Sequence, residues 1–269
     1  MSESGQMMTF GGHLEVLRRM LFRILAVALI LSIAVFCCKD WTFAALLAPG
    51  KSDFCLYRWI EHFLAAIGYN YHFDAFSINL IATDLSSQFM THISTSFYLG
   101  LLGASPYILF ELFRFVSPAL YENERKYSIP VLLIIYILFI IGVLMSYFVL
   151  FPVSLRFLGT YSVAEQVKST ITLDSYITTF VTLTLVMGVI FQLPVIAYFL
   201  AKIGLLQSTY LTKYRQYAFL IIMVVAAIIT PPDLMTLVLV TIPLYLLYEV
   251  SIVVTRRVEA HTTNNRFTE

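Results

Sequence analysis

Long apolar blocks separated by polar segments dominate the hydropathy pattern of this chain. A helix needs about 20 mainly apolar residues to cross the hydrocarbon core of a bilayer. By this criterion the pattern predicts six transmembrane helices, at residues 20–38, 89–113, 129–151, 177–201, 217–230 and 235–254. The fifth block is short, because 14 residues rise only about 21 Å in a core that is about 30 Å thick.

The polar segments between these blocks suggest how the helices are connected. Pro231, Pro232 and Asp233 separate the fifth and sixth blocks, so we expect these two helices to form a tight hairpin. The largest polar segment, 39–88, is expected to form an outer loop. It has enough apolar residues for short helices at the membrane interface, at 44–49, 57–67 and 74–81.

Composition agrees with a membrane protein. Of 269 residues, 59% are hydrophobic and 12% are charged, whereas a soluble domain has about 25% charged residues. These values exclude a soluble globular enzyme and a disordered protein, and a net charge of +1 excludes a nucleic-acid-binding domain. The long blocks exclude an outer-membrane barrel, whose segments are short and alternating. We therefore predict an all-α polytopic membrane protein, with residues 1–269 in a single membrane domain.

Lys and Arg side chains are distributed unevenly between the two sides predicted for the membrane. Twelve of the 17 Lys and Arg residues lie on one side, in the segments before the first block, between the second and third, between the fourth and fifth, and after the sixth. The segments on the other side contain the remaining 5. Cytoplasmic segments of membrane proteins carry the excess of Lys and Arg. The sequence thus predicts a multi-pass protein of the cytoplasmic (inner) membrane with both termini inside the cell.

Catalytic and metal-binding motifs are absent from the sequence. It contains no HExxH, GxSxG, P-loop or GxGxxG motif, and its five His and three Cys residues lack the spacing of metal ligands. We therefore expect no enzyme activity, no metal and no cofactor.

Polar side chains within the predicted spans are few. Gln192 lies well inside the fourth span, two residues before Pro194, which is expected to kink the helix. Two interpretations of Gln192 are open: a polar contact for a partner helix or substrate, or an amide that satisfies carbonyls freed by the kink. Glu111 and Arg114, three positions apart at the inner end of the second span, are expected to pair on one helix face.

The alternative function to consider at this stage is a six-span secondary transporter of a small solute. Such a transporter is expected to have an ionisable side chain near the bilayer midplane, or inverted repeats with broken helices in matching positions. The sequence shows neither feature.

Eight short motifs along the chain resemble, in the same order, those of a known family. The clearest is FVSPALYENER at 115–125, and a second, HLEVLR, occupies 13–18. The others are ATD at 82–84, YFVLFP at 147–152, DSY at 174–176, FQLPV at 191–195, TPPD at 230–233 and IPLY at 242–245. Together these motifs resemble the TatC family, the multispanning receptor subunit of the twin-arginine protein translocase.

The resemblance implies export of folded proteins across the cytoplasmic membrane, driven by the proton-motive force. It implies that the cytoplasmic face binds the twin-arginine signal peptides of the substrates. The implied partners are small single-span proteins, TatA and TatB, and further copies of the chain within the lipid bilayer. The function that the resemblance implies involves neither nucleic acid nor a cofactor.

The resemblance also implies where the signal peptide binds. Glu124 matches the glutamate of the family's loop motif, whereas the glutamate of the N-terminal motif aligns with Val16. Glu15 precedes that position by one residue, a rotation of about 100° on a helix, so it stays open whether Glu15 replaces the family glutamate. The candidate signal-peptide residues are Glu124, Glu15, Phe115, Arg125 and Arg18.

A second group of candidates lies within the membrane. Many family members have glutamate at Gln192, and some have a polar residue at Leu237. We expect the polar contact with a partner helix to involve Gln192 and to shift from Leu237 to Thr230 or Thr236. The candidates for the structural turns and the kink are Pro118, Pro194, Pro231, Pro232 and Asp233.

Overall fold

A computed structural model describes residues 10–51, 53–67, 80–116, 128–162, 164 and 170–266. In this part of the chain the fold is a bundle of helices, with one short pair of parallel strands, β1 (Leu80–Ile81) and β2 (Ile171–Thr172). The prediction of an all-α protein is confirmed. The helices are α1 (Phe10–Cys37), α2 (Lys39–Leu47), α3 (Cys55–Ala66), α4 (Ser87–Gly103), α5 (Ser105–Val116), α6 (Ser128–Met145), α7 (Phe151–Thr160), α8 (Leu173–Ile190), α9 (Leu193–Lys202), α10 (Ser208–Lys213), α11 (Arg215–Ile229) and α12 (Leu234–Arg266).

Four stretches of helix are long and apolar enough to cross a membrane: Leu14–Cys37, Ile129–Thr160, Leu173–Lys202 and Leu234–Ala260. The helices α4 and α5 would form a fifth, because together they meet the same criteria, with a bend of 50° between them. The helix α11 is apolar but has only 15 residues. Within the described residues, length and composition thus support four or five spans, and the six-span count stays a prediction.

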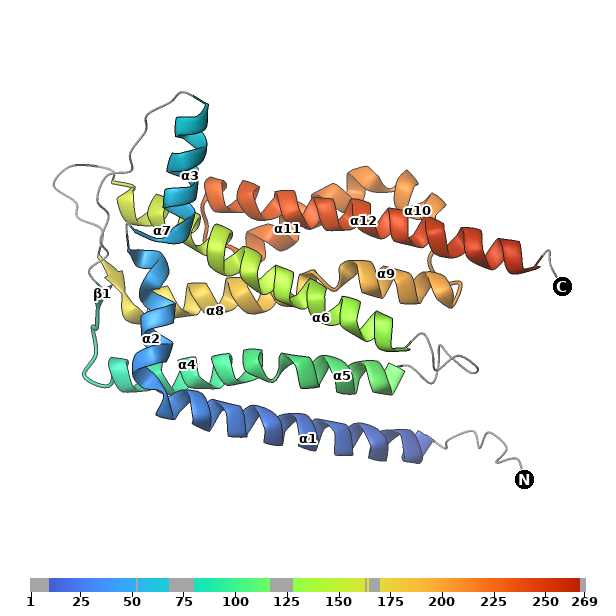
Figure 1. Ribbon diagram of the computed structural model, residues 1–269, viewed down its shortest axis with the longest axis horizontal. Coiled ribbons are helices and arrows are strands. Elements are labelled where there is room, and N and C mark those ends of the chain that lie inside the picture. The colour runs from blue at the N-terminus through green and yellow to red at the C-terminus, as the bar shows by residue number, and fades with distance from the viewer. Residues whose placement is uncertain are drawn as a thin grey trace.

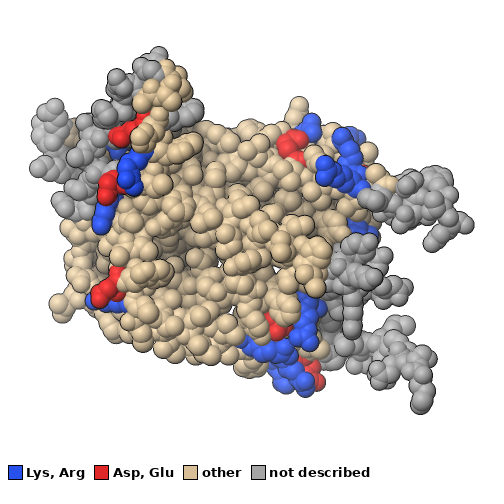
Figure 2. All heavy atoms as spheres, viewed as in Figure 1, with Lys and Arg blue, Asp and Glu red and all other residues tan. Residues whose placement is uncertain are grey.

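The long helices run roughly side by side, and α1 begins at the same end of the bundle at which α12 ends (Figure 1). We call this the terminus end. On the face shown in Figure 2, charged side chains gather toward the two ends, and a broad band between them is free of Lys, Arg, Asp and Glu. This distribution is typical of a protein whose middle faces lipid, where exposed charge is costly.

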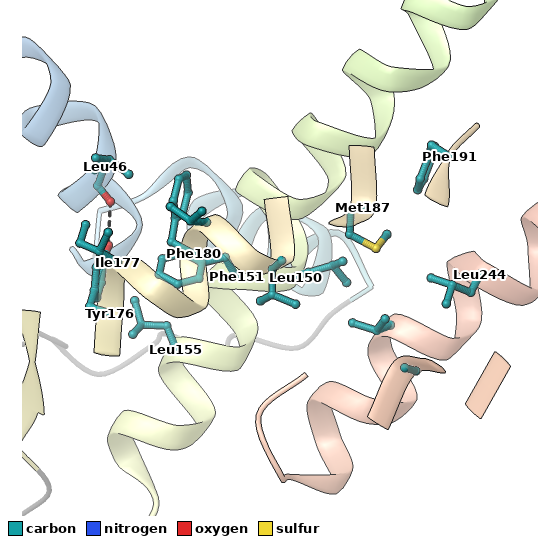
Figure 3. Close-up of a cluster of buried hydrophobic side chains, with 14 of the residues drawn as sticks. Leu46, Leu150, Phe151, Leu155, Tyr176, Ile177, Phe180, Met187, Phe191 and Leu244 are labelled. Atoms are coloured by element: carbon teal, nitrogen blue, oxygen red, sulfur yellow. Dashed lines mark hydrogen bonds between the residues drawn. The ribbon is translucent and has the colours of Figure 1, made fainter. Parts of the chain in front are cut away.

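The helix α8 occupies the centre of the apolar core. Its side chains Tyr176, Ile177 and Phe180 pack with Leu150 and Phe151, which lie where a π-helical turn joins α6 to α7 (Figure 3). The Tyr176 hydroxyl donates a 2.8 Å hydrogen bond to the carbonyl of residue 46 in α2. Buried tyrosines commonly find such a partner, because an unpaired hydroxyl in an apolar core is costly.

Small residues allow the closest helix contacts. Ser96 and Gly100 of α4, and Ala104 just after its end, are spaced four apart and are buried, and Gly100 faces Ser32 of α1. A Cβ atom on Gly100 would lie only 2.5 Å from the backbone nitrogen of Ser32. Stripes of small residues are typical of membrane helices, because they let two backbones approach closely where burial from water contributes little.

The helices α2 and α3 lie toward the end of the bundle opposite the terminus end (Figure 1). Helices occur at Lys39–Leu47 and Cys55–Ala66, close to two of the short helices expected there. The third expectation, a helix at 74–81, is wrong at its end, because Leu80 and Ile81 form β1 and pair with β2; residues 74–79 lie outside the described residues. Local apolar content favoured a helix, but the pairing partner is far away in sequence.

A tyrosine attaches α3 to the bundle. The Tyr57 hydroxyl donates a 2.9 Å hydrogen bond to the carbonyl of Pro152 in α7. Burial raises the pKa of Tyr57 to about 12, and the Arg156 guanidinium, 5.1 Å from the ring centroid, opposes that rise. Tyr57 is therefore protonated, and able to donate this bond, throughout the neutral range.

Candidate functional site

The N-terminal motif lies on a regular helix, because α1 already begins at Phe10. The Glu15 carboxylate is exposed and forms an ion pair with Arg19, one turn further along. Val16 is also exposed and lies about 100° around the helix from Glu15. Since both positions are helical, the Glu15 side chain can point where that of Val16 now points only if the whole of α1 rotates.

The loop motif begins where α5 ends. Phe115 is half-buried in the last turn of α5, which ends at Val116. The other candidates of this motif, Pro118, Glu124 and Arg125, lie outside the described residues. Because α1 and α5 contact each other and both reach the terminus end (Figure 1), the N-terminal motif and the start of the loop motif lie at the same end of the bundle.

A buried carboxylate joins these two helices. The Oε1 atom of Glu111 accepts hydrogen bonds from Arg23 Nη1 of α1, at 3.2 Å, and from the Tyr107 hydroxyl, at 2.8 Å. Glu111 is only 5% exposed. The expected pairing of Glu111 with Arg114 is thus wrong, since the guanidinium that reaches Glu111 comes from 88 positions away in the sequence. Spacing along one helix suggested the local partner, whereas helix packing brings Arg23 to the same carboxylate.

Gln192 lies at a break between α8 and α9, just before Pro194. Its Nε2 atom donates a 3.1 Å hydrogen bond to the carbonyl of Ile135 on α6. Its Oε1 atom is buried and has no hydrogen-bond partner among the described residues. The amide therefore satisfies a carbonyl of a neighbouring helix and not one of its own broken span, and it keeps a free acceptor, so both interpretations of Gln192 are still open.

The hairpin turn between α11 and α12 is shaped by capping bonds. The Asp233 carboxylate accepts a 2.7 Å bond from the backbone N–H of Thr236, so it caps the first turn of α12. The Thr236 hydroxyl donates to Ser154 of α7 at 2.9 Å, and the Thr230 hydroxyl donates to the carbonyl of Ala226 at 2.9 Å. Both threonines therefore already have partners inside the chain.

An open hollow lies against this turn. It is lined by Ala227, Thr230, Pro231, Pro232, Asp233, Leu234 and Leu237. The second carboxylate oxygen of Asp233 is buried without a hydrogen-bond partner in the described part of the chain. Sequence reasoning found Asp233 as a turn residue, but its spare acceptor became visible only in the folded chain.

A third ion pair joins the two helices of this hairpin, α11 and α12. Arg215 Nη2 of α11 lies 2.8 Å from Glu249 Oε2 of α12, and the Tyr245 hydroxyl donates to the other oxygen at 3.1 Å. As for metal binding, the described residues contain no group of three His, Cys, Asp or Glu side chains that could hold an ion.

Comparisons with known proteins agree on one family. Residues 12–243 match the model of the family described as Sec-independent protein translocase protein (TatC). The TatC protein of Blattabacterium sp. subsp. Periplaneta americana (strain BPLAN) is 37% identical over 250 residues, which cover 91% of this chain and 94% of that protein. The TatCy protein of Bacillus subtilis (strain 168) is 37% identical over 183 residues, which cover 68% and 72% of the two chains.

Solved structures extend the similarity to the fold. A crystal structure of the twin-arginine translocase receptor TatC superimposes with a TM-score of 0.72 at 31% identity, covering 92% of this chain and 99% of that one. A second structure of that receptor, in DDM, also gives a TM-score of 0.72, at 32% identity with 90% and 99% covered. The family match spans most of the chain, so this multi-pass membrane protein belongs to the TatC family of the Sec-independent, twin-arginine protein translocase.

Proposed function

We propose that this TatC protein is the signal-peptide receptor and assembly core of its translocase. In this proposal it crosses the inner membrane six times, with both termini in the cytoplasm, so that the terminus end is the cytoplasmic face. Twin-arginine signal peptides of folded substrates bind there, and the proton-motive force drives their transport. The observation that carries the proposal is the contact between α1 and α5, which brings the N-terminal motif and the start of the loop motif to one end of the bundle.

Recognition of two arginines requires carboxylates that can accept charge-assisted hydrogen bonds from guanidinium groups. We assign this role to Glu124 and Glu15, with Phe115 providing an apolar contact and Arg125 and Arg18 completing the site. Glu15 is exposed and already paired with Arg19. Exposed ion pairs are worth only about 0–1 kcal/mol, so an arginine of the signal peptide displaces Arg19 at little cost.

Partner helices are proposed to dock within the membrane. The hollow beside the hairpin turn supports this role, because polar and apolar side chains line it together, and so does the acceptor of Gln192 that has no partner among the described residues. We therefore propose that TatA- and TatB-like single-span proteins contact Thr230, Thr236 and Gln192, and that the chain also associates with copies of itself. The activity we propose is binding and assembly, with no covalent chemistry and no cofactor.

The test of the proposed function is a measurement of signal-peptide affinity. A charge-assisted hydrogen bond contributes about 1.5–3 kcal/mol, so Glu124→Ala should weaken binding of a twin-arginine peptide by about ten- to hundredfold. Glu124→Gln should also weaken binding of the peptide, because it keeps the shape of the side chain and loses the charge. Glu122→Ala, which removes a neighbouring carboxylate, is the matched control and should bind almost normally. Normal binding by Glu124→Ala would refute the receptor assignment.

A further inference from the structure

The ion pair between Arg23 and Glu111 has a feature that stability alone does not explain. Glu111 is 5% exposed, and both of its hydrogen bonds, from Arg23 at 3.2 Å and from Tyr107 at 2.8 Å, end on one carboxylate oxygen. The Glu111 carboxylate is removed from water, whereas the Arg23 side chain stays 50% exposed, and well-packed apolar side chains are often equally or more stabilising than a charged group at a buried position. What an ion pair adds is a fixed relative position of the two groups.

A bend separates α5 from the place where α1 packs closely against α4. A close contact of α1 is at Ser32, which meets Gly100 on α4. Between that contact and the terminus end, α4 gives way to α5 with a bend of 50°. The bond between Arg23 and Glu111 lies beyond the bend and joins α1 to α5 there.

This bond joins the helix that carries Glu15 to the helix that ends at the start of the loop motif. Arg23 is eight positions, or about 12 Å along the helix, from Glu15, and positions 15, 19 and 23, each four apart, lie on one side of α1. Glu111 is five positions, or about 8 Å, from Val116, where the loop motif leaves α5. A change in the rotation or height of α1 at Arg23 is therefore passed on to Glu15.

We propose that Arg23 and Glu111, with Tyr107, are positioning residues of the signal-peptide site. Their ion pair sets the rotation and height of α1 against α5, and so the position of Glu15 relative to the end of α5. The inference rests on the proposed function, since it concerns the geometry of that same site. It assigns the specificity of the site in part to three residues that do not themselves touch the peptide.

The decisive variant replaces both partners with apolar side chains, Arg23→Met with Glu111→Met. This double change removes the bond without leaving a buried unpaired charge, so the chain should remain folded and its unfolding midpoint should stay the same or rise. Spin labels at Leu14 on α1 and Leu112 on α5, both exposed, report the distance between the helices. We expect the distance distribution to broaden and the affinity for a twin-arginine peptide to fall by at least about tenfold, the loss of one charge-assisted bond.

Two further variants separate positioning from a loss of charge or stability. Arg114→Met removes a cation from the same end of the bundle without touching the ion pair, and it should leave the affinity within about twofold of the wild type, since surface substitutions away from a contact change little. Exchange of the charges, Arg23→Glu with Glu111→Arg, should restore a narrow distance distribution and most of the affinity. A merely structural ion pair would show no such parallel between distance and affinity.

The outcomes distinguish this inference from the proposed function. If the wild type binds peptides equally well with and without paired arginines, the proposed function is refuted, and the inference with it. If the wild type binds selectively but the double methionine variant keeps its affinity, the inference alone is overturned. An unchanged distance distribution in that variant would also overturn it, and this measurement needs no peptide.

Discussion

The contact between Gly100 and Ser32 allows a sharp prediction for Gly100→Ala. The added Cβ would lie 2.2 Å from Ser32 Oγ, 2.5 Å from its backbone nitrogen and 2.6 Å from its Cα. Non-bonded carbon atoms prefer separations of about 3.5–4.0 Å. Rotation of the Ser32 hydroxyl relieves only the first of these three contacts, so the backbone of α1 must move away from α4 by about 1 Å.

The size of the effect follows from two opposing terms. Inserting a methyl group into a close-packed contact costs about 1–3 kcal/mol, and the upper end applies here because two of the three clashing atoms belong to the backbone. Replacing glycine with alanine inside a helix stabilises the helix by about 0.8–1 kcal/mol. We therefore expect Gly100→Ala to lower the free energy of unfolding by about 2 kcal/mol.

The assay is the thermal unfolding midpoint of the purified protein in detergent, compared with Gly103→Ala. Gly103 lies on the same helix, but a Cβ there would meet only Leu31 Cδ1, at an ordinary 3.8 Å. The control should therefore unfold at the same temperature as the wild type or at a higher one. Ser32→Ala should not rescue Gly100→Ala, since its backbone atoms remain. If Gly100→Ala were as stable as Gly103→Ala, the close approach of α1 and α4 would be wrong.

Three further predictions concern single side chains. Gln192→Leu should lower export. It should change the free energy of unfolding by less than about 1 kcal/mol, because the loss of the bond to Ile135 is offset by removal of an unpartnered acceptor. Reduced stability with normal export per molecule would contradict a docking role. Tyr57→Phe should cost about 1 kcal/mol at neutral pH. The pKa of the Tyr57 hydroxyl in the wild type rises from 10.0 to about 12 on folding. The free energy of unfolding of the wild type, measured by chemical denaturation, should therefore fall as the pH rises between these values, and that of the variant should not. Asp233→Ala should cost about 1 kcal/mol through the lost cap on the N–H of Thr236, which Asp233→Asn should largely retain.

Much of the architecture could be predicted from sequence, because the signals involved are local. The apolar blocks correctly predicted the helices α1, α8 and α12. A stretch of about 20 apolar residues in a bilayer forms a helix, because only there do its backbone N–H and C=O groups form all their hydrogen bonds within the segment. The turn at Pro231 and the break before Pro194 were visible for the same reason, because proline changes the backbone where it stands.

The family, too, could be predicted from sequence. Short motifs in a fixed order pointed to TatC, and the family model, the relatives and the solved structures confirm it. The candidate residues of the signal-peptide site came from the same motifs and stay predictions, with Glu124 outside the described residues.

What only the tertiary structure decided is which side chains meet. Glu111 was assigned to a neighbour on its own helix but pairs with Arg23, and the amide of Gln192 reaches a carbonyl on another helix, 57 positions away. A helix pattern defines which faces are apolar, but lipid and neighbouring helices are both apolar, so the pattern does not say which face meets which helix. Rotation and height of each helix are set by close packing, as at Gly100, and these decide the long-range polar pairs.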